Sequence, residues 1–271
     1  MNWTRVCGAY FSATGTTGQM VRFLVQQTAG ALSLPTALFD FTLPQARLQP
    51  LTFRPTDLVI FGTPVYAGRV PNVLLPYLRT LRGNGACAVP VVLYGNRAFD
   101  DALMELRELL CAGGLWPIAA GAFIGAHSFS DTLAAGRPDA ADFACAARLA
   151  AELCARRDLP RPAAPVAVDG QMPLRPYYQP RDRQGAAVDI RKVRPVVGAA
   201  CTQCGLCAAR CPMGSIDPDD ARRYRGICIK CGACSKLCPV QARSYDDPGY
   251  LYHKRELELG FTRRAEPSLF F

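Results

Sequence analysis

Eight of the 13 cysteines stand in two short runs that share one spacing. The runs read CTQCGLCAARCP and CIKCGACSKLCP, so gaps of two, two and three residues separate four cysteines, and a proline follows the last. Short gaps let three thiolates point inward from one tight loop, and the fourth cysteine of such a run ligates the other of two [4Fe–4S] clusters. We therefore predict one cluster on Cys201, Cys204, Cys207 and Cys238, and a second on Cys228, Cys231, Cys234 and Cys211.

Other interpretations of this cysteine pattern fit less well. Zinc ribbons also contain CxxC pairs, but not a third such step followed by CxxxCP in two copies. Disulfides need an oxidising compartment, whereas the N-terminus MNWTRVCGAYFS runs directly into a strand pattern without a signal peptide. We therefore expect a cytoplasmic protein. The other cysteines are scattered among apolar residues and are expected to be buried free thiols, namely Cys7, Cys87, Cys111, Cys145 and Cys154.

A second candidate site is the hydroxyl-rich turn between residues 12 and 17, which reads SATGTT. It follows an apolar run at 4–12 and precedes an amphipathic stretch at 17–32, so it stands where a strand passes into a helix. The N-terminus of a helix offers unpaired N–H groups to an anion. The turn lacks the lysine of a P-loop and is not GxGxxG. It predicts a phosphate site formed by neutral donors, although such a turn can also be a helix cap.

The elements that position this turn alternate between strands and helices. Strands are predicted at 4–12, 37–41, 56–66, 87–96 and 116–125, and helices at 17–32, after Pro71, at 99–114 and at 138–157. Alternation of this kind predicts a parallel sheet that is covered by helices on both faces. In open sheets of this class, ligands bind beyond the carboxyl ends of the strands.

The chain resembles the flavodoxin–ferredoxin fusion proteins of anaerobic bacteria and archaea. The resemblance rests on YFSATGTT, GTPVYAGRVP, YGNRAFDDAL, AFIGAHSFS, AAGRP and the two cysteine runs. It implies a flavodoxin-like five-stranded parallel sheet of order 2-1-3-4-5, followed by a small α+β ferredoxin domain. It also implies two [4Fe–4S] clusters, FMN and electron transfer in the cytoplasm. Ala13 departs from the family, which often has glycine there, and an alanine restricts how closely the loop can wrap a phosphate.

In flavodoxins the loops after the third and fourth strands enclose the flavin ring. By this resemblance Tyr66 covers one face of the ring and Phe99 the other, although both residues could simply pack at a helix start. Asn96 replaces an acidic residue of the family pattern and Arg97 adds a cation, so we expect the anionic reduced flavin to form more easily. The predicted FMN-binding residues are Ser12, Thr14, Gly15, Thr16, Thr17, Thr63, Pro64, Val65, Tyr66, Ala67, Gly68, Gly95, Asn96, Arg97, Phe99 and Asp100.

We expect four segments. Residues 1–157 form the FMN-binding domain, 158–194 a Pro/Arg-rich linker, 195–245 the ferredoxin domain and 246–271 a tail that docks on the first domain. The net charge is +9, and most of it follows residue 154, where 20 basic residues stand against 12 acidic ones. A basic ferredoxin half suits an acidic redox partner. Basic and aromatic residues are not interleaved as in nucleic-acid binders. No apolar run approaches the ~18 residues of a membrane span.

These features predict an electron-transfer protein that couples one-electron clusters to a flavin that accepts one or two electrons. One alternative is an FMN-dependent reductase of a small acceptor such as a quinone, with Arg97 and His127 as the polar groups at the flavin. Another is a redox or oxygen sensor, for which no DNA-binding element is present. Whether the chain is an enzyme stays open, because an NAD(P) fingerprint is absent.

Overall fold

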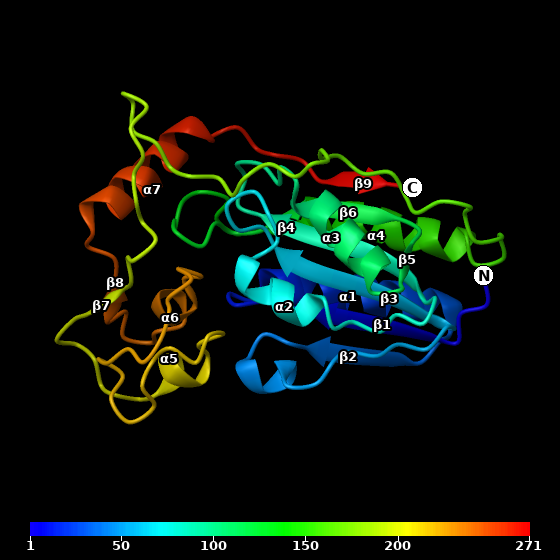
Figure 1. Ribbon diagram of the computed structural model, residues 1–271, viewed down its shortest axis with the longest axis horizontal. Coiled ribbons are helices and arrows are strands. Elements are labelled where there is room, and N and C mark those ends of the chain that lie inside the picture. The colour runs from blue at the N-terminus through cyan, green and yellow to red at the C-terminus, as the bar shows by residue number, and fades with distance from the viewer.

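A computed structural model describes all 271 residues, and a twisted α/β sheet forms its larger part (Figure 1). Five strands run parallel in the order β2-β1-β3-β4-β6. This order confirms the predicted five-stranded sheet. The strands are β1 (Arg5–Tyr10), β2 (Thr36–Asp40), β3 (Asp57–Pro64), β4 (Cys87–Tyr94) and β6 (Ala120–Ile124).

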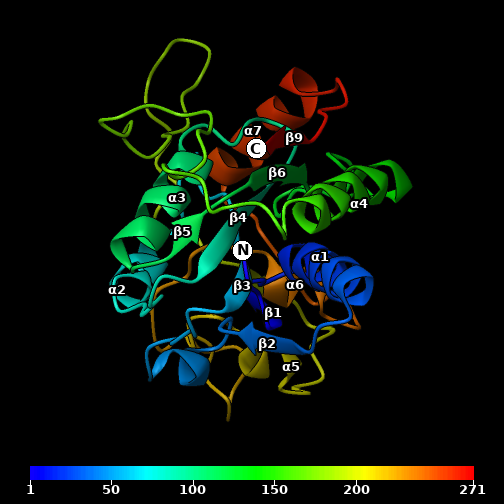
Figure 2. The ribbon, with the colours of Figure 1, turned by 90° about the vertical axis from the view of Figure 1, so that its right-hand side faces the viewer.

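Helices cover both faces of the sheet, as Figure 2 shows. The helix α1 (Thr16–Leu32) and the helix α4 (Ala140–Ala155) pack on one face, and α2 (Leu75–Leu78) and α3 (Ala102–Ala112) pack on the other. The central strands β3 and β4 are buried along almost their whole length, which explains their continuous apolar sequences. Two separate apolar cores, one on each face, therefore hold the sheet and fix the positions of the loops at its carboxyl edge.

The predicted strand at 116–125 is divided into two pieces. The first is β5 (Trp116–Pro117) and the second is β6, and both pair in parallel with β4. Pro117 has no N–H to donate to a sheet ladder, and its carbonyl accepts the N–H of Val166 from the linker at 2.9 Å. The division therefore follows from a proline in the strand and from a neighbouring segment that pairs with it.

The cysteine runs lie in a small unit beside the carboxyl edge of the sheet (Figure 1). Its two-stranded sheet pairs β7 (Val196–Val197) with β8 (Arg243–Ser244), and each run contains one short helix, α5 (Leu206–Ala209) or α6 (Ala233–Lys236). Gly205 and Gly232 precede these helices with φ of 73° and 75°. Only glycine adopts such angles without strain, so both runs turn into their helices in the same way.

The linker and the C-terminal segment lie along the larger part. The linker N–H of Tyr178 donates to the carbonyl of Ala67 at 2.8 Å, and that of Arg175 donates to the Asp101 carboxylate at 2.7 Å. After the helix α7 (Pro248–Gly260), the strand β9 (Ser268–Phe270) pairs antiparallel with β6 and extends the sheet. The remaining elements are two 3₁₀ turns, η1 (Pro44–Arg47) and η2 (Asn72–Leu74). None of the helices combines the length and apolarity that a membrane crossing requires.

Candidate functional site

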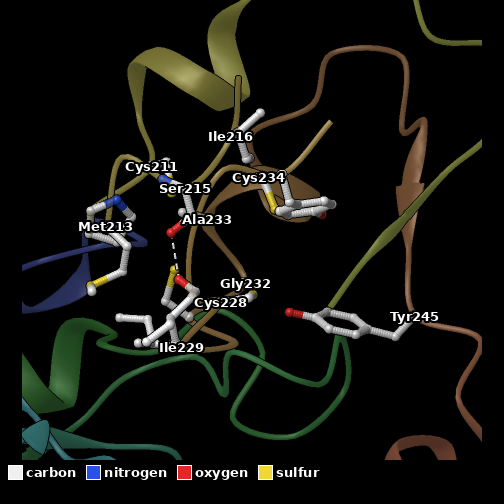
Figure 3. Close-up of a pocket in the computed structure, with 14 residues that line it drawn as sticks. Cys211, Met213, Ser215, Ile216, Cys228, Ile229, Gly232, Ala233, Cys234 and Tyr245 are labelled. Atoms are coloured by element: carbon white, nitrogen blue, oxygen red, sulfur yellow. Dashed lines mark hydrogen bonds between the residues drawn. The ribbon is translucent and has the colours of Figure 1, made fainter. Parts of the chain in front are cut away.

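Four cysteines from both runs line one apolar cavity in the small unit (Figure 3). Cys228, Cys231 and Cys234 come from the second run and Cys211 from the first. Most of the other lining side chains are apolar, among them Met213, Ile216 and Ile229. The four cysteines that the sequence assigns to one cluster therefore surround a common space.

The surroundings of this cavity suit an iron–sulfur cluster. The Cys211 sulfur accepts the backbone N–H of Ser215 at 3.3 Å, and the Cys228 sulfur accepts that of Lys230 at 3.4 Å. Figure 3 shows the Tyr245 hydroxyl directed toward the cysteine-lined space, and this hydroxyl is buried without a partner in the protein. A buried donor without a partner is costly, and the sulfurs of a cluster would satisfy it. The residues present fit the group.

Burial sets the protonation of these thiols in the absence of metal. It raises the pKa of Cys231 to about 12 and that of Cys234 to about 11. Both thiols therefore stay protonated at neutral pH until a metal centre displaces their protons.

No group of three or more His, Cys, Asp or Glu side chains is arranged to hold a single metal ion.

The other predicted set is more open to solvent. Cys204 is exposed, and Cys201, Cys207 and Cys238 are half-buried. The Cys238 sulfur accepts the backbone N–H of Ala242 at 3.2 Å, in the same way as Cys211 accepts that of Ser215. The two sets thus share their local backbone geometry and differ in exposure.

A narrow cavity of about 60 Å³ lies at the hydroxyl-rich turn, between the start of α1 and the ends of β3, β4 and β6. Thr14, Thr16 and Thr17 line it. The N-cap residue of α1, Gly15, has no side chain to cap the helix, and the first turn carries no acidic residue, so the positive end of the helix dipole is not offset by a negative charge. Gly15 reaches the φ of 97° that starts the helix. Neutral hydroxyls and free helix N–H groups fit the phosphate of a flavin nucleotide.

This narrow cavity continues into a second one of about 670 Å³. Six segments line the large cavity: the loops after β3, β4 and β6, the linker, the second cysteine run and α7. Both cavities share Val65, Tyr66, Tyr94, Gly95, His127 and Ser128. The large cavity in turn shares Ile227, Cys228 and Ile229 with the cysteine cavity. Cys228, a predicted cluster ligand, therefore faces the space that adjoins the hydroxyl-rich turn.

Tyr66 connects the two regions. It lines both the narrow and the large cavity, and burial, with a smaller contribution from the nearby Cys231 and Cys228, raises the pKa of its phenol. The phenol therefore stays protonated. The second cysteine run also approaches the loop after β6, where a Cβ added to Gly232 would lie 2.6 Å from the Ser128 carbonyl oxygen. The second cysteine run needs a glycine there in order to approach the loop after β6.

Ten of the 16 predicted FMN-binding residues line one or both cavities. They are Thr14, Thr16, Thr17, Pro64, Val65, Tyr66, Ala67, Gly68, Gly95 and Arg97. Ser12 lies beneath the turn, where its hydroxyl accepts the Gly18 N–H at 2.9 Å. Gly15 lines neither cavity and shapes the backbone, while the Thr63 hydroxyl is buried without a partner.

The remaining three predicted residues, in the loop after β4, line neither cavity. Asn96 donates to the carbonyls of Phe261 and Arg263 at 2.7 and 2.8 Å and accepts the Ala265 N–H, so it clamps the C-terminal segment. The Phe99 ring packs on Tyr94 with 5.6 Å between ring centroids. Asp100 is ion-paired with Arg97.

Sequence reasoning missed the residues that close the large cavity from the linker and α7. The Arg97 guanidinium lies 4.5 Å from the ring centroid of Tyr178, and that ring lies 5.9 Å from His253. The apolar and aromatic residues of the linker, Tyr178 among them, indicated that it packs along the domains, but not that it reaches the predicted flavin site. Tyr94 and Ser128 were also missed.

His127 and His253 both line the large cavity and are uncharged at neutral pH. Burial, with repulsion from His253, Lys236 and Arg97, lowers the pKa of His127 to about 4. Burial and Arg97 likewise lower the pKa of His253 to about 4. His127 Nδ1 accepts the N–H of Phe129 at 3.1 Å, which orients its ring against Gly95.

Residues 224–244 match a family model described as 4Fe-4S binding domain. No curated protein matches the chain. Similar solved structures include a Streptococcus pneumoniae TIGR4 flavodoxin (18% identity, 56% of this chain and 99% of that chain, TM-score 0.40) and flavodoxin 1 of Bacillus cereus (15%, 55% and 95%, 0.40). An NADH:FMN oxidoreductase in its apo form is 19% identical over 56% of this chain and 88% of that chain, with a TM-score of 0.41. By its sheet order and its 4Fe-4S match, the chain joins a flavodoxin-like α/β fold to a 4Fe-4S binding domain.

Proposed function

We propose that this protein is an electron-transfer iron–sulfur flavoprotein that passes electrons between two [4Fe–4S] clusters and a bound FMN. One observation carries the proposal. Cys228 lines the cavity formed by four cysteines and also lines the large cavity that continues into the phosphate turn. A predicted ligand of one redox centre and the predicted site of the other thus face the same space.

The cysteines and their neighbours have distinct tasks in this proposal. Cys228, Cys231, Cys234 and Cys211 would hold the inner cluster, and Cys201, Cys204, Cys207 and Cys238 the outer one. Backbone N–H groups donate to the sulfurs of Cys211, Cys228 and Cys238, which favours the reduced state of a cluster. Around the inner set, the buried Ile216 and the half-buried Ile229 contribute apolar lining.

FMN would supply a centre that accepts electrons singly or in pairs and so couples one-electron carriers to two-electron chemistry. Thr14, Thr16 and Thr17 would bind its phosphate together with the free N–H groups of α1. Tyr66 and Tyr94 would line the space for its ring. The linker and α7 close that space on the outer side and limit the access of water.

Counting the cofactors of the full chain after anaerobic purification tests this proposal. We expect about eight iron atoms, about eight acid-labile sulfides and one FMN per chain, as two [4Fe–4S] clusters and a flavin require. Full iron content with no flavin, and no uptake of added FMN, would reduce the protein to a ferredoxin fused to an α/β domain of other function.

The external redox partner would approach the outer cluster. Cys204 is the exposed member of the eight cysteines, and the basic surplus of the chain follows residue 154. Such a surface suits an acidic redox protein as the electron donor or acceptor. Reduction of the clusters by an acidic ferredoxin should slow steeply as salt concentration rises. A rate that is independent of salt would argue against this partner class.

A second candidate function is reduction of a small acceptor such as a quinone at the flavin. The size of the large cavity, about 670 Å³, and the presence of Arg97 and His127 in its lining favour it. Turnover with a soluble quinone under anaerobic conditions, with dithionite as the donor, tests this function. Substitution of His127 by Gln should then raise KM for the quinone, and an unchanged KM would exclude a role for this side chain.

A further inference from the structure

The large cavity contains four charged side chains, and only one of them lacks an ion pair. Arg97 is paired with Asp100, and Arg191 with Asp189 at 2.7 Å. The Lys230 ammonium has no carboxylate partner, and it donates instead to the carbonyl oxygen of Arg191 at 3.2 Å. Lys230 is therefore the one charged side chain of this cavity without an ion-paired partner, and its neighbours Cys228 and Asp189 partly oppose the effect of burial, which lowers its pKa.

The backbone of the second cysteine run holds Lys230 at this position. Lys230 stands between Cys228 and Cys231 and has a φ of 55°, a left-handed conformation that side-chain-bearing residues rarely adopt. In this conformation its N–H donates to the Cys228 sulfur at 3.4 Å while its side chain reaches the linker. The lysine is thus fixed at both ends between the cysteine cavity and the large cavity.

The first run shows that the cluster loop itself does not require a lysine here. Gln203 occupies the equivalent place in CTQC and has nearly the same φ of 58°. Its side chain is neutral and bonds within its own unit, donating to Asp220 at 3.1 Å and accepting the Ala221 N–H at 2.9 Å. The cluster loop therefore does not need a positive charge at this position, and the charge of Lys230 acts on the large cavity that its side chain lines.

No other side chain supplies an unpaired positive charge to this space at neutral pH. His127 and His253 line it, and burial keeps both imidazoles neutral. The Arg97 charge is offset by Asp100 and lies over Tyr178. Arg97 is therefore less suited than Lys230 to ease formation of the anionic reduced flavin.

We propose that Lys230 is the group that stabilises the anionic reduced form of the flavin in this cavity. The inference rests on the proposed function. Reduction to this form takes two electrons, delivered one at a time through the clusters from a one-electron donor such as dithionite, and one proton from water. The product carries one more negative charge than the oxidised ring, and a nearby unpaired ammonium lowers the free energy of that state. The cluster-binding unit would thereby set the flavin potential.

Potential and affinity measurements on Lys230→Met, with Lys192→Met as a matched control, test this role. Lys192 is exposed and does not line the cavity. We expect Lys230→Met to lower the two-electron midpoint potential by about 30 mV, equivalent to a ~tenfold loss in preference for reduced over oxidised FMN. Lys230→Arg should retain most of that preference, and Lys192→Met should match the parent. Iron content should stay unchanged in all variants because the backbone N–H to Cys228 remains.

Two results would overturn the assignment. Equal loss of affinity for oxidised and reduced FMN in Lys230→Met would make the lysine a general anchor of the nucleotide. A midpoint unchanged from that of Lys192→Met would remove Lys230 from the flavin altogether. If the unsubstituted chain takes up no FMN while holding its full iron, the proposed function fails and the role of Lys230 fails with it.

Discussion

The two cysteine runs are close copies in local structure and opposites in surroundings. In both, a glycine with φ near 75° starts a one-turn helix, and the fourth cysteine accepts an N–H from four residues later, Ser215 at 3.3 Å or Ala242 at 3.2 Å. The thiols that start the second run face an apolar cavity, and Cys231 is only 9% exposed, whereas Cys204 of the first run is exposed; the other six cysteines are half-buried in both runs.

This difference teaches that the spacing of a run determines its local loop, while docking determines its role. Gln203 bonds within its own unit, and its counterpart Lys230 bonds to the linker. Gly232 packs against Ser128 of the α/β part, and Arg47 of that part donates to the Pro212 carbonyl at 2.6 Å. We infer an outer cluster for exchange with partners and an inner cluster for exchange with the flavin.

The strongest way to break this comparison is to remove one ligand from each set. Cys231→Ala and Cys204→Ala should each lose about half of the iron, because each removes one of two clusters. Only Cys231→Ala should abolish rapid reduction of the flavin after the remaining cluster is reduced by a photochemical pulse. If Cys204→Ala abolished it and Cys231→Ala did not, the inner and outer assignments would be reversed.

Removing the phosphate site sharpens the comparison, because it deprives the inner cluster alone of its acceptor. The double variant Thr14→Val/Thr16→Val should weaken FMN binding by about 3 kcal/mol or more, since each hydroxyl bond to a charged group is worth ~1.5–3 kcal/mol. Equilibrium titration of the flavin-free protein with FMN measures this loss. The exposed Thr36→Val on β2 serves as a control and should bind FMN like the parent. Parent-like affinity in the double variant would place the phosphate elsewhere.

Lowering the pH should release the flavin before it releases the outer cluster, because a buried histidine, His253, lines the large cavity. The pKa of His253 is about 4 in the folded chain and about 6.5 in unfolded chains. As pH falls, the unfolded state therefore binds the His253 proton before the folded state does. The stability that the folded chain has with a neutral His253 is fully present above pH 6.5 and is lost as pH falls toward 4. Its size is about 3 kcal/mol by linkage.

Thermal unfolding at pH 7.5 and pH 5, followed by flavin fluorescence, measures this effect. His253→Asn should lose fewer degrees of Tm between the two pH values than the parent does. An equal loss in both proteins would show that His253 does not report on the inner cavity. The exposed first run has no buried histidine, so its cluster should be retained at the pH where flavin is released.

The smallest expected effect comes from a residue that the two sets share. Arg243 is 5% exposed, lies near both Cys207 and Cys234, and donates to the Tyr224 hydroxyl at 2.8 Å. Arg243→Gln should lower both cluster potentials by about 60 mV, or ~1.4 kcal/mol, because both lose the same buried cation. Redox titration followed by electron paramagnetic resonance resolves the two values. A shift confined to one cluster would show that Arg243 serves that set alone.

The sequence predicted those parts of the molecule that depend on short-range patterns. Apolar runs and their alternation with helices identified the parallel sheet, and the structure confirms both the sheet and the strand order that the family resemblance implied. The spacing of the cysteines predicted the sharing of Cys211 between the runs, and the structure places it with Cys228 in one cavity. Hydroxyls before a helix indicated Thr14 and Thr16, which line the narrow cavity. Each of these signals lies within a few residues of the chain.

The rest depends on contacts between distant segments, which no local pattern encodes. Tyr178 and His253 close the large cavity from the linker and α7, and the sequence there shows only stray aromatic residues. Asn96 was predicted to bind FMN because it stands in the flavin loop where the family has an acidic residue, yet its amide is fully used by the C-terminal segment. The role of Lys230 follows from its lack of an ion pair, which only a three-dimensional arrangement can reveal.

The central claim is that electrons pass within one chain between the inner cluster and the flavin. Its most direct test is the rate of flavin reduction after the clusters are reduced by a short photochemical pulse, measured at several protein concentrations. We predict a first-order rate constant that does not change with concentration. A rate that rises in proportion to protein concentration would show transfer between molecules and would contradict the claim.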